Sequence, residues 1–323
     1  MDQREERPKR GRPHVHTFIP VHIALLLIGA QAALGQPADV QADTAITEAV
    51  ELATFVEARA LAADPSGVLY VVDGGRDVVQ KLAPTGAVLA TLGGPGAGEG
   101  EFDGPTDIDP TNGLVLVVAD AGNGRLQRFS RAFLFLEAVP VGSVTGSEAR
   151  LGNASRYGSA RDRLGGPGTG RPTAVAVSPS GETYAISETE GYVIRWDEDR
   201  RTTRTIGGYD AGAGALDEPV ALAADEASLY VADRGQAAVK VYDAFGGYVR
   251  ALARGLATDV QALTLTDDAL WIVLPRQILI YGLDGRLRGA ISVEVGEDLV
   301  DAVRVGGVTY VLTRTRLLLV ENL

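Results

Sequence analysis

The sequence has no cysteine, and this absence removes several kinds of chemistry at once. Without a thiol, the chain of 323 residues can form no disulfide bond, no thiolate metal site and no cysteine nucleophile. Histidine is nearly as scarce, because all three copies, His14, His16 and His22, lie near the N-terminus. If that segment is removed on export, catalysis by a histidine base is excluded as well.

The one long apolar run, residues 18–34, also lies near the N-terminus. Five basic residues precede it and small residues follow it, which is the order of a secretory signal. Ala33 and Gly35 supply the two small side chains that a peptidase needs to cut before Gln36. An uncleaved membrane anchor is the alternative, although the run is short for a bilayer of about 30 Å. The sequence predicts a signal peptide at 1–35 and a periplasmic or extracellular protein.

Positive charge is scarce in the rest of the chain. Removing residues 1–35 leaves 25 basic and 39 acidic residues, a net charge of −14. A protein that binds nucleic acid needs the opposite balance. We therefore expect no nucleic-acid partner. We also expect a monomer that contacts a membrane only through an uncleaved signal segment.

No segment has a convincing helical period, but a strand-like motif recurs six times. Its landmark positions are 70, 117, 184, 230, 271 and 310, separated by 47, 67, 46, 41 and 39 residues. Further short apolar runs and turns rich in Gly, Pro and Asp flank each copy, a pattern typical of antiparallel hairpins. A period of about 40–50 residues is typical of propeller blades. We predict an all-β fold, a six-bladed β-propeller of four-stranded antiparallel blades over 55–323, with an insertion at 142–165.

The sixth copy of the motif is one strand short, because the chain stops soon after its third strand at 317–320. Most propellers close the ring by letting one terminus complete the blade formed by the other. Residues 45–52 alternate enough to form a strand, so we predict that the N-terminal segment 36–54 supplies the closing strand of blade six. The alternative is that 36–54 is a loose spacer.

Two blades carry a longer motif that resembles the NHL-repeat family. Residues 98–105 and 118–120, followed by Asn123 to Phe129, resemble its Gly-rich entry loop, Val-Ala-Asp strand end and Asn-x-Arg-Ile-Gln-x-Phe run. Blade four repeats the pattern in part at 214–219 and 231–233. The resemblance covers about 270 residues and implies a propeller, but one propeller fold serves many functions.

Enzymes on related propellers can be tested against these residues. Peptidyl-amide lyases and streptogramin lyases use histidine, so neither activity is expected of a chain without histidine after residue 22. Gluconolactonase-like enzymes hold calcium with Glu, Asn and Asp on inner strands. The inner runs here, such as 60–63 and 174–177, are small and apolar. The stretch 107–113 has spaced carboxylates, but residues 110–113 within it read first as a tight turn rather than as part of a calcium loop. We therefore predict no catalytic residue, no metal and no cofactor.

Three strand ends carry the same acidic residue, at Asp73, Asp120 and Asp233. Catalytic carboxylates are one interpretation. An aspartate before a Gly-rich turn more commonly accepts backbone N–H bonds within that turn. We favour this structural role.

Arginine is placed more suggestively, around one face of the predicted ring. The turns after the second strands carry Arg76, Arg125, Arg234, Arg276 and Arg314, and the insertion adds Arg156, Tyr157, Arg161 and Arg163. A basic mouth on an acidic body would attract an anionic ligand. Alternatively, each arginine pairs with a nearby acid, an interaction that is worth only about 0–1 kcal/mol when exposed.

These observations favour an exported, non-catalytic propeller that binds a protein, a peptide or another envelope ligand through these nine side chains. The ligand is predicted to be a protein or peptide, with an anionic ligand as one option. The alternative is a divergent calcium-dependent lactonase or hydrolase of the gluconolactonase-like type.

Overall fold

The computed structural model describes residues 44–110, 113–142, 170–199 and 203–320. All of them belong to the compact unit Pro37–Leu323. The predicted signal peptide and all but the first residue of the predicted insertion lie outside the described residues. No helix in the described ranges is long and apolar enough to cross a membrane.

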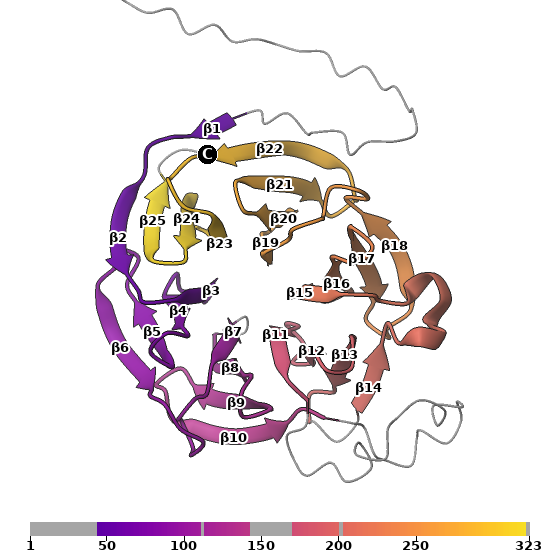
Figure 1. The fold of residues 1–323 in the computed structure, drawn as a ribbon, viewed down its shortest axis with the longest axis horizontal. Helices are drawn as coiled ribbons and strands as arrows, with labels where there is room; N and C mark the ends of the chain where they lie inside the picture. Colours follow the sequence, from indigo (N-terminus) through magenta and orange to yellow (C-terminus); the bar gives the residue numbers. More distant parts are fainter. Residues whose placement is uncertain (1–43, 111–112, 143–169, 200–202, 321–323) are drawn as a thin grey trace, which may run out of the picture. The chain divides into compact units, whose positions relative to one another are not determined.

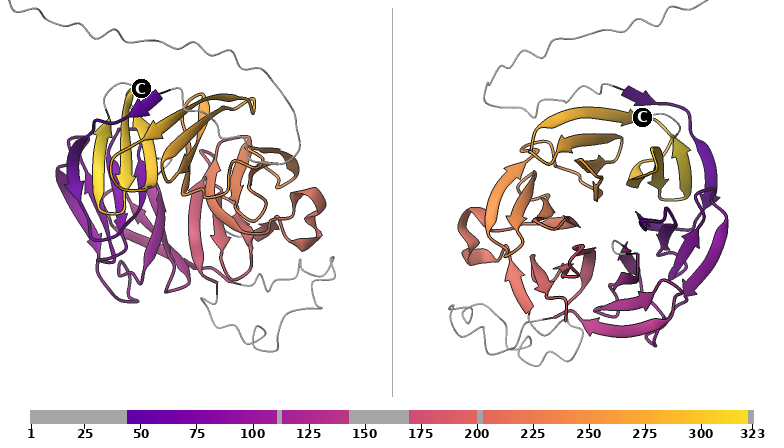
Figure 2. Two further views of the ribbon diagram at one scale, coloured as in Figure 1. Left: turned by 45° about the horizontal axis from the view of Figure 1, so that its top comes forward. Right: turned by 180° about the vertical axis from the view of Figure 1, so that it is seen from behind.

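Strands account for almost all regular structure, and they form six sheets arranged in a ring around a central axis (Figures 1 and 2). Blade one contains β3 (Ala58–Ala63), β4 (Leu69–Asp73), β5 (Val78–Leu82) and β6 (Val88–Gly93). Blade two contains β7 (Pro105–Asp109), β8 (Val115–Asp120), β9 (Arg125–Ser130) and β10 (Phe135–Pro140). Blade three contains β11 (Pro172–Val177), β12 (Thr183–Ser187), β13 (Tyr192–Trp196) and β14 (Thr203–Ile206).

The second half of the chain repeats this organisation. A short 3-10 helix, η3 (Tyr209–Gly214), leads into blade four, with β15 (Pro219–Ala224), β16 (Ser228–Asp233), β17 (Ala238–Asp243) and β18 (Tyr248–Leu252). Blade five contains β19 (Ala262–Leu265), β20 (Ala269–Leu274), β21 (Gln277–Gly282) and β22 (Leu287–Val293). Blade six contains β23 (Leu299–Val305), β24 (Val308–Thr313), β25 (Arg316–Val320) and the N-terminal strand β2 (Val50–Thr54).

The prediction of a six-bladed propeller is therefore confirmed. Each landmark position falls in the second strand of a blade, in β4, β8, β12, β16, β20 and β24. Alternating apolar side chains of adjacent blades pack together between the sheets. Between blades one and two, for example, Tyr70, Phe102 and Phe129 are fully buried in one cluster.

The N-terminal segment closes the ring, as predicted, but it does so in two places. β2 pairs antiparallel with β25, with Val50 opposite Leu319. A second strand, β1 (Thr44–Ile46), pairs in parallel with β22 of blade five. The predicted strand at 45–52 is thus divided into two. Ile46, in β1, is buried in the core between blades five and six, and β2, from Val50 onward, completes blade six.

Candidate functional site in the central channel

The inner strands of the six blades surround a central channel with a cavity of about 650 Å³. Its walls come from β3, β7, β11, β15, β19 and β23, which are the innermost strands of the ring (Figure 1). The turns that follow these strands line the rest of the cavity. A cavity of this size suits a small organic ligand.

Strand register identifies equivalent positions around the channel. In each blade, one inner-strand residue lies opposite the residue two places after the landmark position. These residues are Ala60, Asp107, Ala174, Ala221, Ala262 and Asp301. Four blades therefore place alanine at this level, while blades two and six, on either side of blade one, place aspartate.

The two aspartates make the same hydrogen bonds. The Oδ1 atom of Asp107 accepts the N–H of Ile108, and its Oδ2 accepts the N–H of Val175 in blade three, both at 2.8 Å. The Oδ1 of Asp301 accepts the N–H of Ala302, and its Oδ2 accepts the N–H of Leu61 in blade one, again at 2.8 Å. Each carboxylate thus joins its own inner strand to that of the next blade.

The pKa values of the two carboxyl groups are both raised. Burial raises the pKa of Asp107 to about 8, and repulsion from Asp301 and Asp109 adds to that effect, while the bonds from Val175 and Ile108 oppose it. Burial raises the pKa of Asp301 to about 7, against hydrogen bonds from the backbone N–H groups of Leu61 and Ala302. Both carboxyl groups therefore retain their protons at a higher pH than an exposed aspartate does.

Two carboxyl groups whose environments separate their pKa values can act as an acid and a base in one reaction. Raised pKa values in a cavity are typical of catalytic groups, although structural networks also produce them. Each carboxylate oxygen has a second lone pair beyond the one that its backbone N–H occupies. The channel can therefore support proton transfer to and from a bound molecule.

The channel residues do not fit a calcium ion. Calcium takes six to eight oxygen ligands. Within the described ranges, no three acidic or histidine side chains come together as a metal-binding group. Asp107 and Asp301 lie on strands of different blades, β7 and β23, and offer two carboxylates rather than the larger oxygen set that calcium takes.

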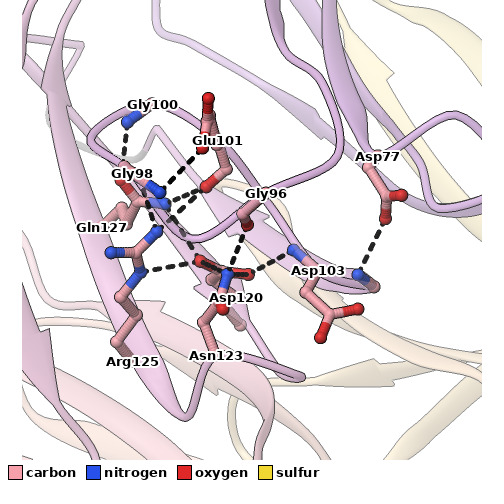
Figure 3. A network of polar contacts seen from close by, with 12 residues as sticks. Asp77, Gly96, Gly98, Gly100, Glu101, Asp103, Asp120, Asn123, Arg125 and Gln127 are labelled. Atoms are coloured by element: carbon pink, nitrogen blue, oxygen red, sulfur yellow. Dashed lines mark hydrogen bonds and ion pairs between the residues drawn. The ribbon is translucent and has the colours of Figure 1, made fainter.

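The predicted turn residues lie away from this channel, in polar clamps at the strand ends (Figure 3). Asp120 is fully buried, accepts the backbone N–H of Asp103 at 2.9 Å and pairs with Arg125 at 2.8 Å. Gln127 donates to the same carboxylate at 3.0 Å, and Arg125 also donates to the carbonyl of Gly98 at 2.7 Å. The clamp ties the Gly-rich entry loop of blade two to β8 and β9.

Asp73 and Asp233 occupy the same place in blades one and four. Asp73 accepts the backbone N–H groups of Val56 and Glu57, and Asp233 accepts those of the equivalent pair before β15. All three aspartates therefore hold the entry loops of their blades.

The five described arginines of the predicted binding surface are each engaged in an ion pair. The pairs are Arg76 with Asp73, Arg125 with Asp120, Arg234 with Glu218, Arg276 with Asp298 and Arg314 with Glu57. None of these five arginines lines the channel. Arg156, Tyr157, Arg161 and Arg163 lie outside the described residues, so a ligand-binding role for this surface stays a prediction.

Sequence reasoning missed Asp301 and considered Asp107 only as part of an unfavoured calcium loop. Asp107 and Asp109 lie in β7, and the tight turn begins only at Pro110, whose carbonyl accepts the N–H of Gly113 at 2.7 Å. Asp301 lies nine residues before its landmark position and Asp107 ten residues before its own. Comparison of the six copies at that distance would have shown both aspartates against a background of alanine.

No protein-family model matches the chain, and no curated protein matches its sequence. Solved structures do match its fold. A "putative gluconolactonase" is 16% identical, with a TM-score of 0.58 over 88% of this chain and 92% of that one. A streptogramin B lyase is 9% identical, with a TM-score of 0.56 over 82% of this chain and 80% of that one. A catalytically inactive histidine-to-alanine variant of virginiamycin B lyase from Staphylococcus aureus, crystallised with quinupristin, is 9% identical, with a TM-score of 0.52 over 84% and 98%.

These comparisons contradict the expectation that the chain is no enzyme. The solved propellers that share its fold include two lyases and a suspected gluconolactonase. At this level of identity the likeness shows the fold, a six-bladed propeller like those of lyases and gluconolactonase-like proteins. The chemistry of this chain has to be argued from its own channel.

Proposed function

We propose that the chain is an exported propeller hydrolase of the NHL-repeat type that opens a neutral lactone or ester in its central channel. The observation that carries the proposal is the matched pair of aspartates, Asp107 and Asp301, at one level of a cavity of about 650 Å³. In this proposal the partner is a small uncharged molecule, and the protein acts as a monomer in the periplasm or outside the cell.

The two aspartates, which both have raised pKa values, share the acid and base roles. Asp301, with a pKa of about 7, is the general base, and Asp107, with a pKa of about 8, is the general acid. Asp301 takes a proton from water as the water oxygen bonds to the substrate carbonyl carbon. Asp107 gives its proton to the leaving oxygen as the carbon–oxygen bond breaks. Ester and water become acid and alcohol, and solvent returns a proton from Asp301 to Asp107.

The absence of histidine from the propeller supports carboxylate chemistry. The inactive virginiamycin B lyase variant carries alanine in place of a histidine. This chain has no histidine after His22, so it cannot use the same group for acid–base catalysis. Carboxyl groups with pKa values near neutrality can perform that task.

The test is hydrolysis of neutral probes, glucono-δ-lactone and p-nitrophenyl acetate, by the purified exported protein. Asp107→Asn and Asp301→Asn should each lower kcat/KM by about 10²–10⁴-fold, the usual value of a general acid or base. Asp267→Asn, an exposed carboxylate where the channel opens, is the matched control and should retain activity. A chelator should have no effect, since the residues do not fit calcium. Hydrolysis that survives in the Asp107→Asn/Asp301→Asn double variant would overturn the proposal.

A further inference from the structure

The inner strand of each blade has a free edge along the channel, and alternate backbone N–H groups of an edge strand point away from its partner strand. One residue after the level of the aspartates, each blade contributes one N–H of this kind. In every blade it belongs to the residue that lies opposite the residue one place after the landmark position. These residues are Leu61, Ile108, Val175, Leu222, Leu263 and Ala302.

Four of these six N–H groups are held in pairs by the two channel aspartates. Asp301 accepts the N–H of Ala302 in its own blade and that of Leu61 in blade one, both at 2.8 Å. Asp107 holds the equivalent pair of blades two and three in the same way. One carboxylate therefore spans the N–H groups of two adjacent blades, with one oxygen on each.

The third pair of adjacent blades, four and five, has the same two N–H groups but no carboxylate between them. The donors are Leu222 on β15 and Leu263 on β19, strands that lie side by side in the ring (Figure 1). The residue in the place of the aspartate is Ala221, whose methyl group accepts no hydrogen bond. The ring therefore contains three donor pairs, of which two are bonded to a carboxylate of the chain.

The strand register turns the N–H groups of Leu222 and Leu263 toward the channel. At the end of β15, Asp225 donates its N–H to the first residue of β16 at 3.0 Å, so alternation turns the N–H of Leu222 away from β16. Thr266 donates to the first residue of β20 at 2.8 Å, which turns the N–H of Leu263 away from β20 in the same way.

Both leucines line the cavity, and they are only 6% and 8% exposed. No hydrogen bond among the described residues involves the N–H of Leu222 or of Leu263. A buried N–H without an acceptor is destabilising. The two groups are therefore available to an acceptor that enters the channel.

We propose that the N–H groups of Leu222 and Leu263 bind the carboxylate of a small aliphatic acid. Ala221 lacks the carboxylate carbon and the two oxygens that aspartate places between the other donor pairs, and a carboxylate supplied by a ligand takes their place. Hydrogen bonds from N–H groups to an ionised acceptor are stronger than bonds to a neutral one. The neighbouring cavity residues Val220 and Ala262 are apolar, which suits a short carbon chain.

Charged side chains of both signs also line the cavity. Outside the aspartate level they are Arg59, Arg304, Asp64, Asp109, Asp225 and Asp267. At the aspartate level, burial raises the pKa of Asp107 to about 8 and that of Asp301 to about 7, so both are mostly uncharged at pH 6 and repel an anion little. Binding is therefore best measured at pH 6.

The experiment is a titration of the purified exported protein with sodium acetate at pH 6, with sodium chloride as the control salt. The protein is labelled with ¹⁵N-leucine, and its backbone amide signals are followed by NMR and assigned from Leu222→Met and Leu263→Met. Both signals should shift downfield with acetate and saturate with one midpoint, because one carboxylate bonds to both N–H groups. Signals that stay unchanged, or that shift equally with chloride, would overturn the proposal.

A pair of variants separates this site from a general effect of charge. Ala221→Asp supplies the carboxylate from the chain itself and should abolish the acetate shifts. Ala223→Asp adds the same charge two residues farther along β15, at the position equivalent to Asp109, and should retain them. Acetate shifts that survive in Ala221→Asp, or that are lost equally in both variants, would show that the acetate does not bind between these two N–H groups.

The inference does not depend on the proposed hydrolysis, although hydrolysis of an ester releases a carboxylic acid that this site would hold. If acetate shifts both signals in a protein that hydrolyses neither neutral probe, the proposed function fails and the carboxylate site stands. If hydrolysis depends on Asp107 and Asp301 but acetate shifts neither signal, the carboxylate site is wrong and the proposed function stands.

Discussion

The carboxylate of Asp301 accepts the backbone N–H of Leu61 at 2.8 Å across 240 residues of sequence. This bond joins the inner strand of the last blade to that of the first, so one side chain contributes both to closure of the ring and to the candidate site. Asp107 makes the equivalent bond from blade two to Val175 of blade three.

Replacing Asp301 should therefore destabilise the propeller. Asp301→Ala leaves the buried N–H groups of Leu61 and Ala302 without an acceptor, and each unsatisfied group costs about 1–3 kcal/mol. We expect the Tm to fall by several degrees in a thermal melt followed by circular dichroism. Asp301→Asn keeps one acceptor oxygen, so its Tm should lie between those of Asp301→Ala and the wild type. Equal melting of all three proteins would contradict a structural role for this carboxylate.

Stability should depend on pH through both aspartates. Because their folded pKa values are raised, to about 8 for Asp107 and about 7 for Asp301, the folded chain holds protons that the unfolded chain has released. Their contribution is fully present below about pH 4 and is lost as the pH rises through about 7 and 8. Urea unfolding at pH 5 and pH 8 measures the resulting change in the free energy of unfolding.

The comparison has to be made between variants, because other carboxyl groups act in the opposite direction. Hydrogen bonds lower the pKa of Asp64 and of Glu182 in spite of their burial, so both favour the folded state at higher pH. Asp107→Asn should lose less stability than the wild type between pH 5 and pH 8. An identical pH dependence in both proteins would show that the pKa of Asp107 is not raised.

The sequence predicted the blades well because each carries local signals. Alternating strands and Gly-rich turns lie within single repeats, and a missing fourth strand in the last repeat pointed to the N-terminus. β1 was not predicted, because it is only three residues long and pairs in parallel with a strand of another blade. The pairing of Arg314 with Glu57 joins residues 257 positions apart, so no local pattern could show that this arginine already has a partner.

The candidate site was harder to predict, for a related reason. Asp107 lies three residues before the turn at 110–113, and that turn made a calcium loop at 107–113 less favoured, so the Asp107 carboxylate received no role of its own. Asp301 lies in blade six, outside the two blades that carry the longer repeat motif, so no motif drew attention to it. Only the register of the inner strands shows that the two residues occupy one level of the channel.

Two arginine variants should show whether the clamp of blade two stabilises the fold. Arg125 is 16% exposed and bonds to Asp120 and to the entry-loop carbonyls of Gly98 and Glu101, whereas Arg276 is 80% exposed and pairs with the exposed Asp298 at 3.1 Å. Arg125→Ala should lower the Tm by several degrees and speed proteolysis of the entry loop. Arg276→Ala should leave the Tm within error, because exposed pairs contribute little. Equal effects would mean that the clamp does not hold the loop.

The N-terminal strand β1 should stabilise the junction of blades five and six through one side chain. Ile46 is 4% exposed and lies in the cluster of Trp271, Ile291 and Leu318, while Ala45 beside it is exposed. Ile46→Ala should cost about 2–5 kcal/mol, the usual effect of truncating a buried isoleucine. Chemical denaturation measures the change, and Ala45→Ser, at the exposed position, is the matched control. If Ile46→Ala is as stable as the control, β1 does not contribute to the fold, and β2 alone closes the ring.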